Sequence, residues 1–336
     1  MKFIATSVME RIDTIDPIMQ ARELGDRTFQ LKDVDAVILN YRVGLMAAQA
    51  ARSANENGVN SVFIIDNRSD DDSVPVLKRD VSSFAEILAL PENVGFASGN
   101  NAGAKLGKNP LILFMNADVL LNPGSVRQMV DVMNANPSVG IVTPSLCGPD
   151  GENQASAYFL LSPFRVVKLL LGIDKLGALL GWPALAGNAD LMRNGDYTGV
   201  VESVYGACML IRRAAFEAVN GFDEEFFIYC EETDLCLRLR KAGWKAYRCG
   251  VAQAKHWHGQ SAQKAARKSL ILMSESHRLY ARKHFSLRGR IVTSLAFIAG
   301  LSIRILLAKS LEAKKNYFAA LGVWLSWTHP ADPRRR

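Results

Sequence analysis

Disulfide and zinc chemistry are the first things missing from this sequence. The chain has five cysteines, an odd number, and no two of them stand in a C-x-x-C pair. A disulfide framework needs paired cysteines and a structural zinc site needs closely spaced ligands, so neither is expected here. No small-residue cleavage site follows the N-terminal apolar run that ends at Glu10, so we expect no signal peptide. The sequence therefore predicts a reducing, cytoplasmic location.

Long hydrophobic runs are missing as well. Residues 176–189 and 291–303 are apolar and uncharged, but each is shorter than the roughly 20 residues that a membrane-spanning helix needs. The first of these runs is also interrupted by Pro183 and three glycines. We therefore expect no transmembrane segment.

Three further patterns are absent, and each absence removes a class of function. The chain shows no internal repeat, and it lacks the G-x-G-x-x-G spacing of dinucleotide-binding loops. No strand interleaves basic and aromatic residues, so we expect no nucleic-acid partner. What is present is a basic excess, with a net charge of +7 and 49% hydrophobic residues. Such a globular chain suits a phosphate-bearing substrate or an anionic membrane surface.

The N-terminal half alternates strand and helix patterns. Four β-branched apolar runs predict buried strands, at residues 36–41, 61–66, 110–118 and 139–144. Helical patterns at 44–58 and 124–137 separate them, which predicts an open α/β sheet. In such sheets ligands bind at the carboxyl ends of the strands. Four polar residues follow strands there: Asn40, Asp66, Asn67 and Asp118.

Two of these strand ends allow a binding role or a local one. A carboxylate at Asp66 can accept a hydrogen bond from the imide of a uracil or thymine base, or from a ribose hydroxyl. The Asp-Asn-Arg-Ser sequence at 66–69 equally suits a turn or cap. The carboxylate of Asp118 suits Mg²⁺ or Mn²⁺, which take few protein ligands beside phosphate oxygens and water. Asp118 alternatively caps the turn into Asn-Pro-Gly-Ser.

Glycines and histidines mark two later stretches. Glycines at 95, 99 and 103 predict a tight loop before a helix, with amides free for a phosphate or sugar, or else an ordinary Gly/Asn loop. His256 and His258 flank Trp257, and a histidine near a diphosphate can ligate a metal or donate to phosphate.

Three acids stand within four residues at a predicted helix start: Glu231, Glu232 and Asp234. Acids at that position complement the helix dipole by about 0.3–1 kcal/mol each. Crowded carboxylates beside the apolar residues 226–230 also raise one another's pKa, as a general base requires. Both interpretations remain open from the residues alone.

Taken together, six stretches in this order resemble the inverting family 2 glycosyltransferases of the GT-A fold, and most closely their bacterial rhamnosyltransferase-like branch. The stretches are VILNY, IIDNRSDDDS, ENVGFASGNNAGAK, LFMNADVLLNPG, YGACMLIRRAAFEAVNGFDEEFFIYCEETDLCLRLRKAGW and HWHGQS. The resemblance implies a Rossmann-like open mixed sheet with flanking helices over residues 34–265. An N-terminal extension, residues 1–33, precedes it, and a basic amphipathic helical region, 266–336, follows.

The resemblance also implies residue roles. It places the nucleotide-sugar against one set of residues: Asn40, Tyr41, Asp66, Asn67, Asn93, Gly95, Gly99, Asn100 and Asn116. It places Mg²⁺ or Mn²⁺ on Asp118 with His256 beside the diphosphate, and the catalytic base at Glu232 among Glu231 and Asp234. Two departures from the family pattern are Asn116, which replaces the first acid of D-x-D, and Glu232, which replaces an aspartate.

The implied activity is inverting transfer of a sugar from dTDP-rhamnose or a UDP-sugar to a glycan or polyprenyl-linked hydroxyl in cell-surface polysaccharide synthesis. The basic C-terminal region is then expected to lie on the anionic cytoplasmic face of the inner membrane, or else to pack on the catalytic domain. Two other functions stay open: a nucleotidyltransferase or pyrophosphorylase, and a non-catalytic nucleotide-sugar-binding protein on the same fold.

Overall fold

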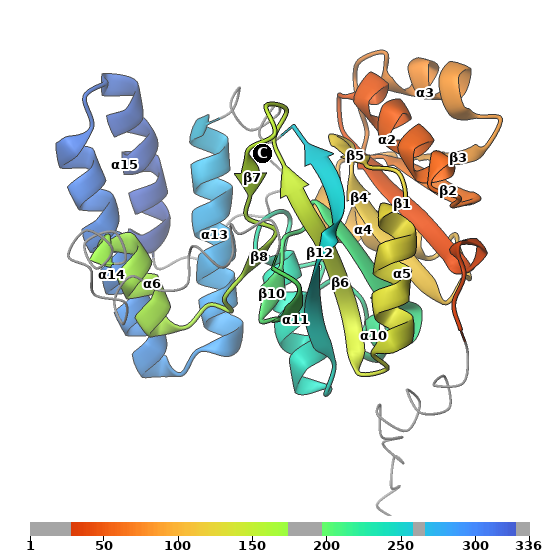
Figure 1. Ribbon diagram of the computed structural model, residues 1–336. Coiled ribbons are helices and arrows are strands. Elements are labelled where there is room, and N and C mark those ends of the chain that lie inside the picture. The colour runs from red at the N-terminus through yellow and green to blue at the C-terminus, as the bar shows by residue number, and fades with distance from the viewer. Residues whose placement is uncertain (1–27, 174–196, 258–265, 327–336) are drawn as a thin grey trace, which may run out of the picture.

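The structure is a computed structural model that describes residues 28–173, 197–257 and 266–326. A mixed sheet forms its centre, with the strand order β3-β2-β1-β4-β11-β6-β12-β5 (Figure 1). In this sheet β7 also pairs with β6 and β9 with β12, and β8 and β10 form a separate two-stranded sheet. The strands are β1 Val34–Asn40, β2 Ser61–Asp66, β3 Ala85–Ala89, β4 Leu111–Asn116, β5 Val119–Leu121, β6 Val139–Cys147, β7 Asn153–Gln154, β8 Ala157–Tyr158, β9 Gly199–Val201, β10 Ser203–Val204, β11 Cys208–Arg212 and β12 Lys245–His256.

The helices cover the sheet on both faces and form a group at one side. They are η1 Leu31–Asp33, α2 Gly44–Glu56, α3 Ser73–Val81, α4 Gly95–Ala104, α5 Ser125–Ala135, α6 Pro163–Leu170, α10 Arg213–Ala218, α11 Glu231–Lys241, α13 Ala266–His284, α14 Leu287–Leu307 and α15 Leu311–Leu325. The predicted α/β fold with a helical C-terminal region is confirmed.

The parallel half of the sheet follows from β-branched, wholly buried strands. Strands β3, β2, β1 and β4 run parallel, and the apolar side chains of β1 and β4 are almost completely buried. Strand β3 was not expected from the sequence, because Ala85–Ala89 is short and half-exposed. The parallel arrangement brings the carboxyl ends of β1, β2 and β4 to one edge.

The second half of the sheet is mixed. Strand β11 runs antiparallel to both β4 and β6, while β12 runs parallel to β6 and antiparallel to β5. The last pairing sets Val119 opposite His256, although 137 positions separate them in the sequence. Residues 147–201 contribute β7, β8, β9 and helix α6, none of which the sequence indicated.

The C-terminal helices have a core of their own. Helix α6 packs with α14, and α13 and α14 pack with α15, beside the sheet (Figure 1). Their small core includes Val166, Phe297 and Trp324, and the last two rings stack with centroids 4.1 Å apart. Helix α6 therefore joins the helical region from a distant part of the chain, which the sequence did not predict.

Helix α14 corrects the expectation about membrane segments. It continues beyond the uncharged run at both ends, through Arg290 and Arg304, and reaches 21 residues. By length and composition it could cross a membrane, and it is the one such helix in the described part of the chain. Since core helices of soluble proteins pass the same test, this finding alone does not place α14 in a bilayer.

The end of the predicted N-terminal extension packs on the domain. Phe29 is buried in the main core, and its backbone exchanges two hydrogen bonds with the Asn134 side chain on α5. The guanidinium of Arg212 lies over its ring at 5.2 Å. Residues 28–33 thus belong to the sheet domain, whereas the rest of the extension and His258 lie outside the described residues.

Candidate active site

The ends of β1 and β2 form a buried polar pair. The Asn40 amide donates to Asp66 Oδ1 at 2.7 Å, and the backbone N–H of Ser69 donates to Asp66 Oδ2 at 2.9 Å. The turn interpretation of Asp-Asn-Arg-Ser is therefore confirmed. Asp66 is 1% exposed, while Tyr41 next to it is 36% exposed. The structure thus brings Asn40, Tyr41 and Asp66 together at the expected edge.

Asn67 ties this edge to the start of helix α4. Its Oδ1 accepts from the N–H of Val94 at 2.9 Å, and its Nδ2 donates to the carbonyl of Gly95 at 3.1 Å. Asn93 accepts from the N–H of Gly95. Gly95 has φ +85°, and an added Cβ would lie 2.3 Å from the Phe227 carbonyl oxygen. The backbone therefore approaches residue 227 so closely that only glycine fits.

The predicted glycine loop at residues 92–105 is wrong beyond this turn. Residues Gly95–Ala104 are themselves helix α4. An added Cβ on Gly99 would lie 2.6 Å from Leu39 Cδ1, so this glycine lets the helix lie against β1, and its predicted contact with the donor stays a prediction. Asn100 is buried within the helix and donates to the Phe96 carbonyl at 3.0 Å.

The turn between β4 and β5 holds the predicted metal residue. Asn116 ends β4, and Asp118 follows one residue later. His256 reaches this turn from β12, with its Nε2 3.5 Å from Asp118 Oδ1 and its Nδ1 2.9 Å from Gln154 Oε1. Burial raises the pKa of Asp118 to about 6. The carboxylate is thus enclosed with too little positive charge to offset its desolvation.

This pair suits a divalent cation that is shared with a substrate. Across residues 28–173, 197–257 and 266–326, no group of three His, Cys, Asp or Glu side chains could hold a metal ion. Mg²⁺ and Mn²⁺ do not need such a group when phosphate oxygens and water complete an octahedron. The contact with Gln154 orients the His256 ring, as an outer partner does for a metal ligand. Asp118 and His256 therefore fit the expected role.

The acids begin helix α11 after a strained turn. Tyr229 and Cys230 both have left-handed backbones, with φ 72° and 66°. Glu231 is almost fully buried, and burial followed by the charge of Glu232 raises its pKa well above the usual range. Burial also raises the pKa of Glu232 to about 7. Oε2 of each carboxylate is buried and lacks a hydrogen-bond partner within the described residues.

Tyr205 and Gly206 lie between Glu232 on one side and the predicted metal residues, Asp118 and His256, on the other. The Tyr205 ring contacts His256 with centroids 5.8 Å apart. Burial, then the charges of Tyr158, Glu232 and Asp118, raises the pKa of Tyr205. A Cβ on Gly206 would lie 3.8 Å from Glu232 Cβ. The carboxylates of Glu232 and Asp118 therefore both lie beside the turn at Tyr205 and Gly206. Sequence reasoning missed Tyr205, whose only signal was a Tyr-Gly pair directly before a buried strand.

Asp234 does not belong with the other two acids. Its Oδ2 accepts from Arg238 at 2.7 Å, and its Oδ1 lies 2.7 Å from His284 Nε2. Burial alone would raise the pKa of Asp234, but the bonds from His284 and Arg238 outweigh it and lower the pKa. Both oxygens of Asp234 are therefore committed to partners, and its predicted catalytic role stays a prediction. Asp234 does stand in the first turn of α11, the position from which an acid complements the helix dipole.

The sequence comparison agrees with this geometry. The sequence profile of glycosyl transferase family 2 matches residues 36–219, more than half of the chain. The chain belongs to this family. A second profile, described as the N-terminal domain of galactosyltransferase, matches residues 191–259 of the glycosyltransferase. The second match spans Tyr205, the acids and His256.

Relatives in two bacteria that the glycosyltransferase resembles are rhamnosyltransferases. It is 28% identical to the N-acetylglucosaminyl-diphospho-decaprenol L-rhamnosyltransferase of Mycobacterium tuberculosis over 76% of this chain and 87% of the relative. It is 27% identical to the rhamnosyltransferase WbbL of Escherichia coli K12 over 60% of this chain and 76% of the relative. These matches favour an enzyme of the rhamnosyltransferase-like branch over the nucleotidyltransferase and non-catalytic alternatives.

Solved structures show the same fold. A Pyrobaculum calidifontis mannosyltransferase, solved with GDP-Man and Mn²⁺, superposes with a TM-score of 0.53 at 14% identity, over 95% of this chain and 90% of that one. Residues 1–349 of S. aureus TarS, solved with UDP-GlcNAc, superpose with a TM-score of 0.54 at 13% identity, over 87% of this chain and 80% of that one. The glycosyltransferase has the GT-A fold.

Proposed function

We propose that this enzyme transfers a hexosyl group, from dTDP-rhamnose or a UDP-sugar, to a hydroxyl of a glycan or polyprenyl-linked acceptor in cell-surface polysaccharide synthesis. One observation carries the proposal: the Glu232 carboxylate is enclosed, lacks a partner on one oxygen, and borders the same turn as Asp118. A general base at Glu232 and a site for the donor diphosphate at Asp118, both beside the turn at residues 205 and 206, suit a direct displacement. The M. tuberculosis and E. coli relatives support rhamnose as the sugar.

The proposed chemistry is a single displacement. Ionised Glu232 accepts the proton of the acceptor hydroxyl while the hydroxyl oxygen forms a bond to the anomeric carbon of the donor. The bond from that carbon to the donor diphosphate breaks on the opposite face, so the anomeric centre inverts and the nucleoside diphosphate leaves. Burial and the charge of Glu232 raise the pKa of Glu231 and so favour its protonated form, which can donate a hydrogen bond to Glu232 or to an acceptor hydroxyl. Asp118 and His256 would hold Mg²⁺ or Mn²⁺, which neutralises charge on the departing diphosphate.

Asp66 is the proposed contact for the donor base. We expect Asp66→Asn to weaken nucleotide binding by about tenfold, because the amide loses the charged acceptor and disturbs the Asn40 and Ser69 contacts. Asp66→Ala should weaken it further. Calorimetric titration with UDP, dTDP and GDP measures the change and also identifies the preferred base.

A matched control lies at the opposite end of β1. Asp35 is equally buried and pairs with Arg213 at 2.8 Å. Asp35→Asn should lower thermal stability as much as Asp66→Asn, yet leave nucleotide affinity intact. Unchanged affinity of Asp66→Asn for all three nucleotides would remove Asp66 from the donor site.

We also propose that the α14–α15 hairpin holds the enzyme on an anionic membrane. Its tip exposes three leucines, Leu306, Leu307 and Leu311, at 80%, 75% and 69%. Basic residues Lys309 and Lys314 stand among them. Exposed apolar side chains beside lysines are typical of interfacial anchors on anionic lipid. A polyprenyl-linked acceptor would be reached from such a surface.

A triple variant with Leu306→Ser, Leu307→Ser and Leu311→Ser should bind phosphatidylglycerol vesicles at least about tenfold more weakly, since three apolar side chains no longer insert into the lipid interface. The melting temperature should stay unchanged, because these side chains are already exposed. Vesicle flotation measures binding. Val251→Ser, 66% exposed on β12, is the control. Undiminished flotation of the triple variant would place the anchor elsewhere.

A further inference from the structure

The segment that presents the acids has little structure of its own. We call residues 223–230, between α10 and α11, the acid loop. It has no helix or strand, and it ends at the left-handed residues Tyr229 and Cys230. Two consecutive non-glycine residues in that conformation cost free energy and persist only where neighbouring groups fix them. Glu231 and Glu232 follow directly, so whatever fixes the acid loop also fixes the acids.

One side of the acid loop is held by helix α4. The carbonyl of Phe227 accepts from the N–H of Phe96 at 2.6 Å. The Asn101 amide bonds both the N–H and the carbonyl of Phe222 and reaches Glu224 at 3.0 Å. Helix α4 begins beside the carboxyl ends of β1 and β2, where the nucleotide-sugar is predicted to bind. These contacts therefore connect the acid loop with the predicted donor site.

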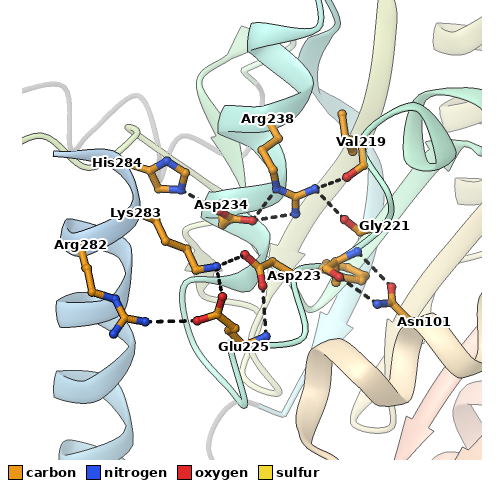
Figure 2. Close-up of polar contacts among 11 residues, drawn as sticks. Asn101, Val219, Gly221, Asp223, Glu225, Asp234, Arg238, Arg282, Lys283 and His284 are labelled. Carbon is orange, nitrogen blue, oxygen red and sulfur yellow. Dashed lines mark hydrogen bonds and ion pairs between the residues drawn. The ribbon is translucent and has the colours of Figure 1, made fainter. Parts of the chain in front are cut away.

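The other side is held by helix α13, as Figure 2 shows for its last turn. Lys283 Nζ lies 2.7 Å from Asp223 Oδ2 and 2.6 Å from Glu225 Oε1. About two turns before it on α13, the buried Ser276 hydroxyl donates to the carbonyl of Ile228 at 2.7 Å. That carbonyl belongs to the residue directly before the left-handed pair, so Ser276 bonds the loop where its backbone is strained.

Helix α13 also holds α11 itself. His284 Nε2 bonds Asp234 Oδ1, and Arg238 bonds the other oxygen of Asp234 and the carbonyls of Val219 and Gly221 (Figure 2). Between these polar contacts, Tyr280 is 1% exposed and packs on Phe226 and Cys230. Helix α13 therefore fixes the first turn of α11, which carries Glu232, through two contacts: His284 with Asp234, and Tyr280 with Cys230.

We propose that α13 is part of the catalytic apparatus and that Ser276 and His284 are positioning residues for the general base. The proposal rests on the proposed function, because it takes Glu232 as that base. Its consequence is that a catalytic domain ending at residue 265 is incomplete: the unit that can turn over substrate extends at least to His284. The C-terminal region then has two roles, with α13 ordering the acids and the α14–α15 hairpin contacting the membrane.

Matched variants of the full chain test this assignment. His284→Leu removes the donor to Asp234, whereas His284→Gln offers an amide N–H in its place. Ser276→Ala removes the bond to the Ile228 carbonyl. We expect kcat to fall about tenfold or more for His284→Leu and Ser276→Ala, since small displacements of a catalytic group have effects of up to about 10²-fold. Donor KM and nucleotide affinity should stay near the wild-type values, and His284→Gln should recover most of the rate.

Two further variants separate the possible outcomes. Lys268→Ala, exposed on the same helix, should behave as the wild type. Wild-type kcat for His284→Leu and Ser276→Ala beside an inactive Glu232→Gln would overturn the positioning role and leave the proposed function standing. Full activity of Glu232→Gln would overturn the proposed function instead. Equal loss of kcat and nucleotide affinity, with no rescue by His284→Gln, would reduce α13 to a structural support.

Discussion

Replacing Glu232 by glutamine is expected to lower sugar transfer by about 10²–10⁴-fold, the usual contribution of a positioned base. Glutamine keeps the shape of the side chain and removes its basicity. Donor binding should stay nearly intact, since Glu232 faces the acceptor hydroxyl in the proposed displacement. Product formation and calorimetric donor titration on the same preparation measure the two effects.

Glu231→Gln is the matched control for this experiment. Burial, followed by the charge of Glu232, raises the pKa of Glu231 and favours its neutral form, so a neutral amide of the same size is a close substitute. We expect Glu231→Gln to keep activity within about tenfold of the wild type, the loss being a single reoriented hydrogen bond. If Glu231→Gln is inactive while Glu232→Gln transfers sugar normally, the base has been assigned to the wrong acid.

The pH dependence provides a separate check on Glu232. A general base works in its ionised form, so kcat should rise with pH and level off above the raised pKa of about 7. The folded protein holds this proton at pH values where the unfolded chain has lost it. Stability must therefore fall as pH rises from about 4.5 towards 7, and Glu232→Gln should remove that fall. A wild-type melting temperature with the same pH profile as the variant would contradict the raised pKa.

Replacing Asp118 by asparagine is expected to raise the Mg²⁺ or Mn²⁺ concentration for half-maximal activity by at least about tenfold. Asparagine keeps one oxygen but loses the charge that offsets the cation. Calorimetric titration of Mn²⁺ in the presence of a nucleoside diphosphate should show the same weakening. Because the pKa of Asp118 is about 6, wild-type metal affinity should also fall as pH falls through that value.

Asp131→Asn, exposed on α5, controls for loss of one negative charge from the surface. It should leave the metal dependence unchanged. Undiminished wild-type activity in a chelator would remove the metal role altogether, and the charge of the leaving diphosphate would then have to be met by protein side chains.

The sequence by itself determined the parts of this enzyme that depend on neighbouring residues. Composition located β1, β2 and β4 of the parallel half, because a buried parallel strand must be apolar throughout, and it missed the half-exposed β3. The ends of those runs marked Asp66 and Asp118, since carboxyl ends of parallel strands share one edge. The Glu-Glu-x-Asp cluster marked the start of α11 for an equally local reason: charge density beside an apolar segment is visible without a fold.

Only the tertiary structure decided which of these residues work together. The antiparallel pairing of β12 with β5 brings His256 to Asp118. Asp234 gains Arg238 and His284, whereas the Oε2 atom of Glu232 gains no partner among the described residues, so two acids of one cluster acquire opposite pKa shifts. The acidity of a carboxyl depends on burial and on charges within a few ångströms. Spacing along the chain does not show which distant helix contributes: Arg238 lies on α11 itself, whereas α13 supplies His284 from 50 residues away.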